Sequence, residues 1–266
     1  MTEKVPSYPA RKLILNLVKE AEEPMAAQTL LRIADLFGIE ANNVRVTLNR
    51  LVKEDLLKLT DRGVYELGVK ARSLAAAQER WRVLEEELVP WEGHWYVLHV
   101  AHLGRRNRKQ VRQRERAMDL RGFRALQQGL LVRPQNLACS AAQLKQSLCD
   151  LGLESGAVLM SSVTFQLDDA PDAALWAPQA LTDNYRRQTV EMISWLGGYH
   201  LIPLEQAARE SFLIGDQVLH TLAYDPRLPE ELVDTTARRR LVETMKTFDD
   251  VGNRIWSDLI ASIAGD

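Results

Sequence analysis

The stretch from Leu30 to Lys53 limits the possible folds of this chain more than any other. Apolar side chains recur at helical spacing from Leu30 to Phe37, and a second amphipathic pattern predicts a helix over 41–55. Gly38 lies between the two patterns. Glycine readily adopts the left-handed backbone conformation that ends a helix. Two helices joined by so short a turn predict a helix-turn-helix.

A short hairpin is expected directly after these helices. Strand-like segments at 56–59 and 64–67 flank the turn Asp61-Arg62-Gly63. A further amphipathic helix is expected around residues 13–18, before the other two. The order helix, helix, helix, hairpin therefore predicts a winged helix-turn-helix DNA-binding domain over residues 1–72.

The second helix of the motif carries side chains that suit the major groove of DNA. No acid lies between Ala41 and Lys53, and Arg and Asn make bidentate contacts to guanine and adenine. The N-terminal residues of such a helix lie nearest the bases, and Arg62 at the hairpin tip is placed to reach a phosphate or the minor groove. The candidate DNA-binding residues are Asn42, Asn43, Arg45, Thr47, Asn49 and Arg50 in the groove, with Lys53 and Arg62 on phosphates.

Two other interpretations of this segment stay open. Three helices also fit a structural bundle whose polar face is solvated, and helix-turn-helix modules also bind other proteins. The net charge of residues 1–80 is only +2, which does not favour strong non-specific binding to a polyanion.

The middle of the chain alternates strands and helices in a regular order. Residues 71–88 predict one exposed helix that ends at Pro90 and links two modules. Strand, helix, two strands, helix and strand follow between His94 and Gln166. This order predicts a ferredoxin-like β-α-β-β-α-β domain. The linker is therefore placed at 73–90 and the middle domain at 91–167.

The last part of the chain is expected to be helical. An acidic, proline-containing linker at 168–174 precedes three helical patterns, at 179–196, 205–223 and 236–264. The sequence therefore predicts an α+β protein whose C-terminal domain, residues 168–266, is helical.

Charge is distributed unevenly between these modules. Residues 81–166 carry a net charge of +4 and residues 167–266 carry −8, although the whole chain carries only −2. The most basic stretch, 104–124, holds nine basic and two acidic residues. It fits a seat for the phosphates of a coenzyme A ester, a second contact to the DNA backbone, or a solvated face paired with the acidic C-terminal domain.

Aromatic residues from the middle and last domains suggest where an aromatic effector would bind. Trp95, Tyr185 and Trp195 are candidates to line such a pocket, although aromatic residues more often form core. The candidate effector-binding residues are Arg106, Arg108, Arg112 and Arg121 for phosphates, with Trp95, Tyr185 and Trp195 for the acyl group.

Three groups of residues occur in order along nearly the whole chain. The first is Phe37-Gly38-Ile39, followed by Val44-Arg45, Asn49-Arg50-Leu51 and Tyr65-x-Leu67. The second is Trp91-x-Gly93-x-Trp95, followed by Arg121-Gly122-Phe123 and Val132-x-Pro134. The third is Tyr224-Asp225-Pro226-Arg227-Leu228-Pro229. As an ordered set they resemble the PaaX family, the repressors of phenylacetic acid degradation operons.

This resemblance implies a winged-helix domain, a ferredoxin-like middle domain and a helical C-terminal domain, residues 168–266, that serves dimerisation and effector binding. It also implies a dimeric repressor that is released from operator DNA by an aryl-CoA thioester such as phenylacetyl-CoA. A two-fold symmetric dimer is expected to bind a pseudo-palindromic operator.

Several other classes of protein are not supported by the sequence. No segment approaches the length of apolar chain that crosses a membrane, and no signal-peptide pattern follows Met1. Two cysteines, Cys139 and Cys149, make no disulfide framework or zinc set, so a cytoplasmic location is expected. No catalytic or nucleotide-binding motif occurs. We therefore expect no enzymatic activity, no cofactor and no metal, with an enzyme acting on CoA esters or nucleic acid as the remote alternative.

Overall fold

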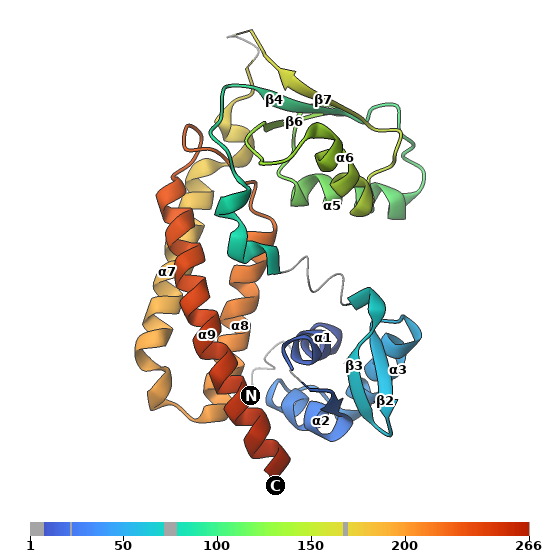
Figure 1. Ribbon diagram of the computed structural model, residues 1–266, viewed down its shortest axis with the longest axis vertical. Coiled ribbons are helices and arrows are strands. Elements are labelled where there is room, and N and C mark those ends of the chain that lie inside the picture. Colours follow the sequence, from blue (N-terminus) through green and yellow to red (C-terminus); the bar gives the residue numbers. More distant parts are fainter. Residues whose placement is uncertain (1–7, 22, 72–78, 167–169, 266) are drawn as a thin grey trace, which may run out of the picture. The chain divides into compact units, whose positions relative to one another are not determined.

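The computed structural model describes residues 8–21, 23–71, 79–166 and 170–265 (Figure 1). The protein combines helices with antiparallel sheets, as α+β proteins do. The chain forms two compact units. The first comprises Met1–Arg80, Ser194–Gly215 and Lys246–Asp266, and the second comprises Trp81–Ile193 and Asp216–Met245.

Three helices and a small sheet make up the N-terminal part of the first unit. The strands are arranged in the order β1-β3-β2 and all pairs are antiparallel. Gly38, at φ 67°, supplies the left-handed turn between the second and third helices. The elements are α1 (Ala10–Glu20), β1 (Met25–Ala26), α2 (Ala27–Leu36), α3 (Ala41–Lys53), β2 (Leu57–Asp61) and β3 (Val64–Leu67).

The core of the first unit contains residues from both ends of the sequence. Leu30, Ile33 and Val44 are fully buried between the N-terminal helices. Phe212 and Trp256, from the C-terminal part of the chain, pack against the same core. The structural unit therefore extends beyond the boundary that the sequence suggested at residue 72.

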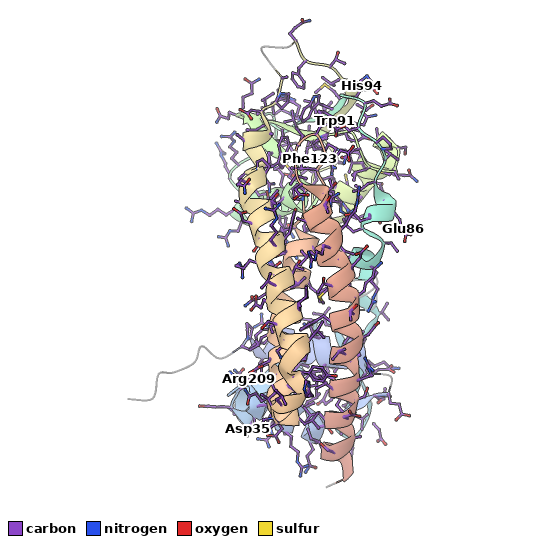
Figure 2. All side chains as sticks on the ribbon, turned by 90° about the vertical axis from the view of Figure 1, so that its left-hand side faces the viewer. Asp35, Glu86, Trp91, His94, Phe123 and Arg209 are labelled. Carbon is purple, nitrogen blue, oxygen red and sulfur yellow. The ribbon has the colours of Figure 1, made fainter. Side chains whose placement is uncertain are left out.

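A four-stranded antiparallel sheet organises the second unit. Its strand order is β5-β6-β4-β7, and α5 and α6 lie together on one face of the sheet (Figure 1). The buried core between them includes Leu98, Phe123 and Leu148; Phe123 is labelled in this part of the molecule in Figure 2. In chain order the elements are β4 (Trp95–His99), α5 (Arg108–Leu120), β5 (Arg124–Gln127), β6 (Leu130–Pro134), α6 (Ala141–Asp150) and β7 (Val158–Val163).

The segment before this sheet differs from the expected exposed helix. Residues 72–78 lie outside the described residues, and Glu79–Val83 and Glu85–Glu87 form short 3₁₀ turns. Leu84 is fully buried, while Glu85 binds Arg238 at 2.8 Å and Glu87 pairs with Arg227. Over residues 79–87 the helical pattern is misleading, because the burial of Leu84 and the ion pairs to distant arginines override local helix propensity.

The remaining helices are α7 (Pro178–Gly198), α8 (Leu204–Ala223) and α9 (Thr235–Gly265). Each of them contributes residues to both units. They follow a 3₁₀ turn at Ala173–Trp176, which overlaps the end of the linker expected at 168–174. The buried Trp176 donates its indole N–H to the carbonyl of Gly122 at 2.8 Å. Among the described residues, the helices are all too short or too polar to cross a membrane.

Candidate nucleic-acid interface

Helix α3 has one buried face and one exposed polar face. Val44, Leu48 and Leu51 are at most 2% exposed and recur at the spacing that places them on one side of the helix. The residues at the opposite side are exposed, and they include all but one of the α3 residues expected to contact DNA. These exposed residues are Asn42, Asn43, Arg45, Val46, Asn49, Arg50 and Lys53.

Thr47 is the expected contact that lies at the edge of this face. Its side chain is half-buried and its hydroxyl donates to the amide oxygen of Asn43 at 3.3 Å. The hydroxyl therefore orients Asn43 within the helix surface. Val46, by contrast, was not selected from the sequence, although it is 59% exposed at the centre of the face. An apolar side chain at this place suits the methyl group of thymine.

An acid just beyond the end of α3 holds one of its arginines. The Glu54 carboxylate accepts from Arg50 at 3.0 Å and from Arg11 of α1 at 2.5 Å. First the hydrogen bond from Arg11, and then that from Arg50, hold the pKa of Glu54 below its usual value. Arg50 is still 73% exposed, so Glu54 neutralises part of its charge without removing it from the surface.

The hairpin formed by β2 and β3 carries its own counter-charges. Arg62 is exposed in the turn, and its backbone N–H donates to the carboxylate of Asp61 at 2.6 Å. Lys58 lies opposite Glu66 in the register and binds it at 3.0 Å. On the hairpin, Arg62 therefore lies next to the acid Asp61, and Lys58 is paired with Glu66. On α3, by contrast, no acid lies within the helix itself.

The four arginines expected to hold effector phosphates are not gathered at one place. Arg106, Arg108 and Arg112 are exposed near the start of α5, whereas Arg121 follows its end. At 1.5 Å per residue, Arg108 and Arg121 are separated by about 20 Å along the helix axis. Arg121 is half-buried and donates to the Ser147 hydroxyl. Arg121 therefore does not share one phosphate site with the other three arginines, contrary to the expectation from the sequence.

The three aromatic residues expected to line an effector pocket belong to separate packing clusters. Trp95 stacks on Trp176 with ring centroids 6.0 Å apart. Trp195 lies in the first unit, where it stacks on Tyr199 at 5.1 Å. Both tryptophan rings are buried, so each fills the core of its own unit rather than lining an open pocket there.

The third member of that set, Tyr185, is also a core residue. It is 1% exposed, and its hydroxyl donates to the Asp225 carboxylate at 2.5 Å. Burial, and then the negative charge of Asp225, raise the pKa of Tyr185. Asp225 also accepts the backbone N–H of Arg227 at 2.6 Å, so this network fixes the Tyr224–Pro229 loop that the sequence analysis singled out.

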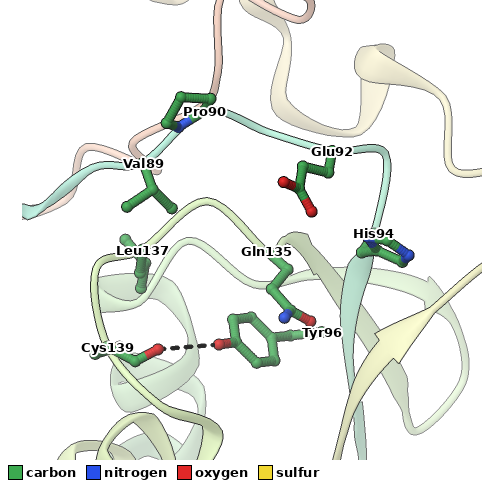
Figure 3. Close-up of a pocket in the computed structure, with 8 residues that line it drawn as sticks. All are labelled: Val89, Pro90, Glu92, His94, Tyr96, Gln135, Leu137 and Cys139. Atoms are coloured by element: carbon green, nitrogen blue, oxygen red, sulfur yellow. Dashed lines mark hydrogen bonds between the residues drawn. The ribbon is translucent and has the colours of Figure 1, made fainter.

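The second unit contains a small open cavity of about 290 Å³ (Figure 3). Glu92 and His94 approach it from the segment before β4, and Gln135 and Cys139 from the segment after β6. The Tyr96 hydroxyl at its base donates to the backbone carbonyl of Cys139 at 3.3 Å. Figure 2 places Trp91 and His94 in this same part of the molecule. The lining holds a carboxylate and no Lys or Arg, so it does not suit the phosphates of a CoA ester.

Two histidines lie close together at the end of the first strand of this sheet. β4 ends at His99, so His102 lies beyond the strand and the two rings come within 5.1 Å. His102 Nε2 lies 2.8 Å from the carbonyl oxygen of Gly156. Among the described residues no group of three His, Cys, Asp or Glu side chains is placed to hold a metal ion.

Comparisons with known proteins inform only on the fold. No family model matches the sequence, and no curated protein matches it. A solved structure, that of an uncharacterized protein, Rv0674, from Mycobacterium tuberculosis, is similar, with a TM-score of 0.59 and 19% sequence identity. The alignment covers 92% of this chain and 98% of that chain. At this identity the likeness concerns the fold alone.

Proposed function

We propose that the protein is a one-component transcriptional regulator that binds operator DNA through α3. The observation that carries the proposal is the exposed face of α3, which presents Arg45, Arg50 and Lys53 together with three asparagines. Arg and Asn are the side chains that distinguish guanine and adenine in the major groove. No acid occurs within the helix, so the face is complementary to a polyanion.

The arrangement of elements supports the finer description of the fold. Helices α1 to α3 with the β1-β3-β2 sheet fit a winged helix-turn-helix, in which β2 and β3 form the wing. The order β5-β6-β4-β7 fits a ferredoxin-like domain. The two strands that precede helices, β4 and β6, are neighbours at the centre of the sheet, and β5 and β7 lie at its edges. Both domain descriptions agree with what the resemblance to the PaaX family implies.

We further propose that the regulator is a homodimer. Val190 and Ile193, one helical turn apart on α7, are 66% and 45% exposed, and apolar side chains on one helix face favour association. A two-fold dimer would place two copies of α3 on a pseudo-palindrome. Sedimentation velocity of the wild type and of Val190→Glu/Ile193→Glu tests this, because a wild-type monomer, or a variant that remains dimeric, contradicts it.

The effector proposal, an aryl-CoA thioester such as phenylacetyl-CoA, is supported by the family resemblance. The effector must bind one state of the dimer better than the other, and a tenfold loss of operator affinity requires about 1.4 kcal/mol of coupling. The cytoplasmic location belongs to the same proposal.

Fluorescence anisotropy with the protein's own promoter DNA tests both parts. We expect specific binding that phenylacetyl-CoA weakens. Arg45→Ala should cost about 1–3 kcal/mol and relax preference at one base pair, whereas Lys53→Ala should weaken all sequences alike. If both variants keep the wild-type preference and affinity, α3 is not the recognition helix. If the protein binds the promoter but no aryl-CoA ester releases it, the DNA-binding proposal still holds and the effector proposal is contradicted.

A second candidate is a protein-binding module, which exposed apolar residues favour. Val46 on α3 is 59% exposed and Leu59 on the hairpin is 50% exposed, and such residues also suit a protein partner. Salt dependence distinguishes the two functions. For a DNA-binding face, the logarithm of the affinity falls with the logarithm of the salt concentration, with a slope of about 0.9 for each phosphate contacted.

A further inference from the structure

The strongest exposed charge in the second unit lies at the start of α5. We call the following six residues the α5 basic face: Arg105, Arg106, Arg108, Lys109, Arg112 and Arg116. All six are exposed, and Glu115 is the one acid between residues 105 and 118. Within the described part of the chain, no carboxylate forms an ion pair with any of the six. One of the three interpretations of this stretch paired it with the acidic C-terminal domain; among the described residues of the second unit, none of the six forms an ion pair with an acid of that domain.

This face is held in place from the opposite side of the helix. Arg114 is 5% exposed, binds Glu154 through two hydrogen bonds of 2.5 and 3.0 Å, and donates to the Gly104 carbonyl at 2.8 Å. Asn107 caps α5 by accepting from the backbone N–H groups of Lys109 and Gln110. The backbone that carries Arg105 and Arg106 is thus fixed at both ends, so binding a partner has to order only the side chains.

The spacing of the cations suits an extended polyanion. Arg108, Arg112 and Arg116 recur every four residues, which places them in a row along one side of α5. The row is about 12 Å long, at 1.5 Å per residue. One strand of duplex DNA carries a phosphate about every 3.4 Å along the axis, so this length spans three or four phosphates of a strand.

A compact phosphate ester fits the same face less well. All six side chains are exposed rather than gathered around a cavity, and the cavity near Tyr96 holds Glu92 and no cation. Tight binding of a small anion requires several donors that converge on one group. A row of solvated cations instead gives the additive, sequence-independent attraction typical of DNA-backbone contacts.

We propose that the α5 basic face is a second DNA-binding surface, which contacts the phosphates of duplex DNA without reading its sequence. The inference rests on the proposed function in that it assigns α5 a share of the affinity for DNA and α3 the specificity. The two roles are measured differently. Loss of phosphate contacts on α5 changes the salt dependence of binding to every duplex alike, whereas loss of base contacts on α3 changes the sequence preference.

The test compares two variants that lose the same charge. The first is Arg108→Gln/Arg112→Gln/Arg116→Gln, and the control is Arg186→Gln/Arg187→Gln/Arg240→Gln, whose exposed arginines lie on α7 and α9 of the same unit. Affinity for promoter DNA and for a random-sequence duplex of equal length is measured against salt concentration. Circular dichroism melting checks that both variants fold.

The quantity compared is the slope of the logarithm of the affinity against the logarithm of the salt concentration. In the α5 variant we expect this slope to be smaller by about 2.7 on both duplexes, since each of the three lost phosphate contacts contributes about 0.9. The control should keep the wild-type slope. This result supports the α5 basic face even if promoter binding proves unspecific and Arg45→Ala has no effect, in which case only the proposed function fails. Equal slopes for the two variants overturn the inference, whatever α3 does. The inference is also overturned if the α5 variant keeps the wild-type salt dependence on DNA but loses affinity for coenzyme A. The face would then be a phosphate-ester site.

Discussion

At the scale of single residues, Glu54 shows how one side chain tunes the surface that α3 presents. The acid-free stretch of the predicted helix ends at Lys53, and the next residue, Glu54, binds Arg50 and also Arg11, which is distant in the sequence. The candidate residues of α3 could be chosen from the sequence because helical spacing determines which of them are exposed. The Arg11 contact could not, since it depends on how α1 packs against α3.

Glu54→Gln should therefore strengthen DNA binding. Removing the carboxylate frees Arg50 for a phosphate or base and removes a negative charge beside the face. We expect affinity to rise about threefold at low salt, on the scale of surface charge pairs. Asp35→Asn is the matched control, because Asp35 is an exposed acid of α2 in the same unit. Anisotropy titrations that show the same affinity for Glu54→Gln, Asp35→Asn and the wild type would contradict this role.

The ion pair between Arg114 and Glu154 predicts a pH-dependent contribution to stability. The hydrogen bond from Arg114 holds the pKa of Glu154 below its usual value. The folded state therefore favours the charged carboxylate, and the stabilisation is complete above the unfolded pKa of about 4.3 and is lost as pH falls through the folded value. Glu154→Gln should cost about 2 kcal/mol at pH 7 and progressively less below pH 4.

Urea denaturation of the wild type and Glu154→Gln between pH 3 and 7 measures this difference. Glu115→Gln is the control, because it removes the same charge from an exposed position on α5. A stability difference between wild type and Glu154→Gln that stays constant over this range would show that Glu154 acts by packing alone.

At the scale of elements, local patterns predicted most helices and strands, and tertiary contacts explain the rest. The helix expected over 41–55 is found at Ala41–Lys53, and the pattern at 236–264 is found at Thr235–Gly265, because amphipathic spacing and glycine stops are local signals. The pattern over 71–88 failed where Glu85 and Glu87 bind Arg238 and Arg227. Those partners lie far along the chain and leave no periodic signal.

Gly122 is a turn residue whose role depends on such a distant contact. Its φ is 72°, and a Cβ atom there would lie 2.6 Å from the carbonyl oxygen and 2.8 Å from the Cα of Pro226. Gly122→Ala should therefore cost about 3 kcal/mol, through left-handed strain and the shift of the Pro226 backbone. This corresponds to a fall in Tm of about 6–12 °C.

Two other glycines of the same unit separate strain from close approach. Gly93 has φ 80° with no atom near its Cβ position, and Gly104 has open space without a positive φ. Gly93→Ala should thus show only the conformational cost, of about 1 kcal/mol, and Gly104→Ala almost none. Calorimetric melts in which Gly122→Ala and Gly93→Ala lose equal stability would remove the argument for close packing of the Pro226 loop.

At the scale of the whole molecule, the division of the chain was the hardest feature to predict. Composition and charge suggested consecutive domains, whereas the first unit combines Met1–Arg80 with Ser194–Gly215 and Lys246–Asp266. The Phe212 ring lies 5.2 Å from Tyr8 and 5.3 Å from Phe37, and Arg32 donates to the Ile263 carbonyl at 2.9 Å. Sequence patterns detect the apolar face of a helix but not which distant helix covers it.

This arrangement predicts that α1 and α2 depend on the C-terminal helices for their stability. Phe212→Ala removes a half-buried ring that contacts Tyr8, Phe37 and Trp256 and should cost about 3 kcal/mol. Amide hydrogen exchange should accelerate in α2 more than in α5 and α6 of the second unit. Phe248→Ala, which removes a ring that contacts Trp195 in the same unit, should leave α2 less affected. If Phe212→Ala leaves the exchange of α2 unchanged, the N-terminal helices are stable by themselves, and the proposed DNA-binding surface is not linked through packing to the C-terminal helices.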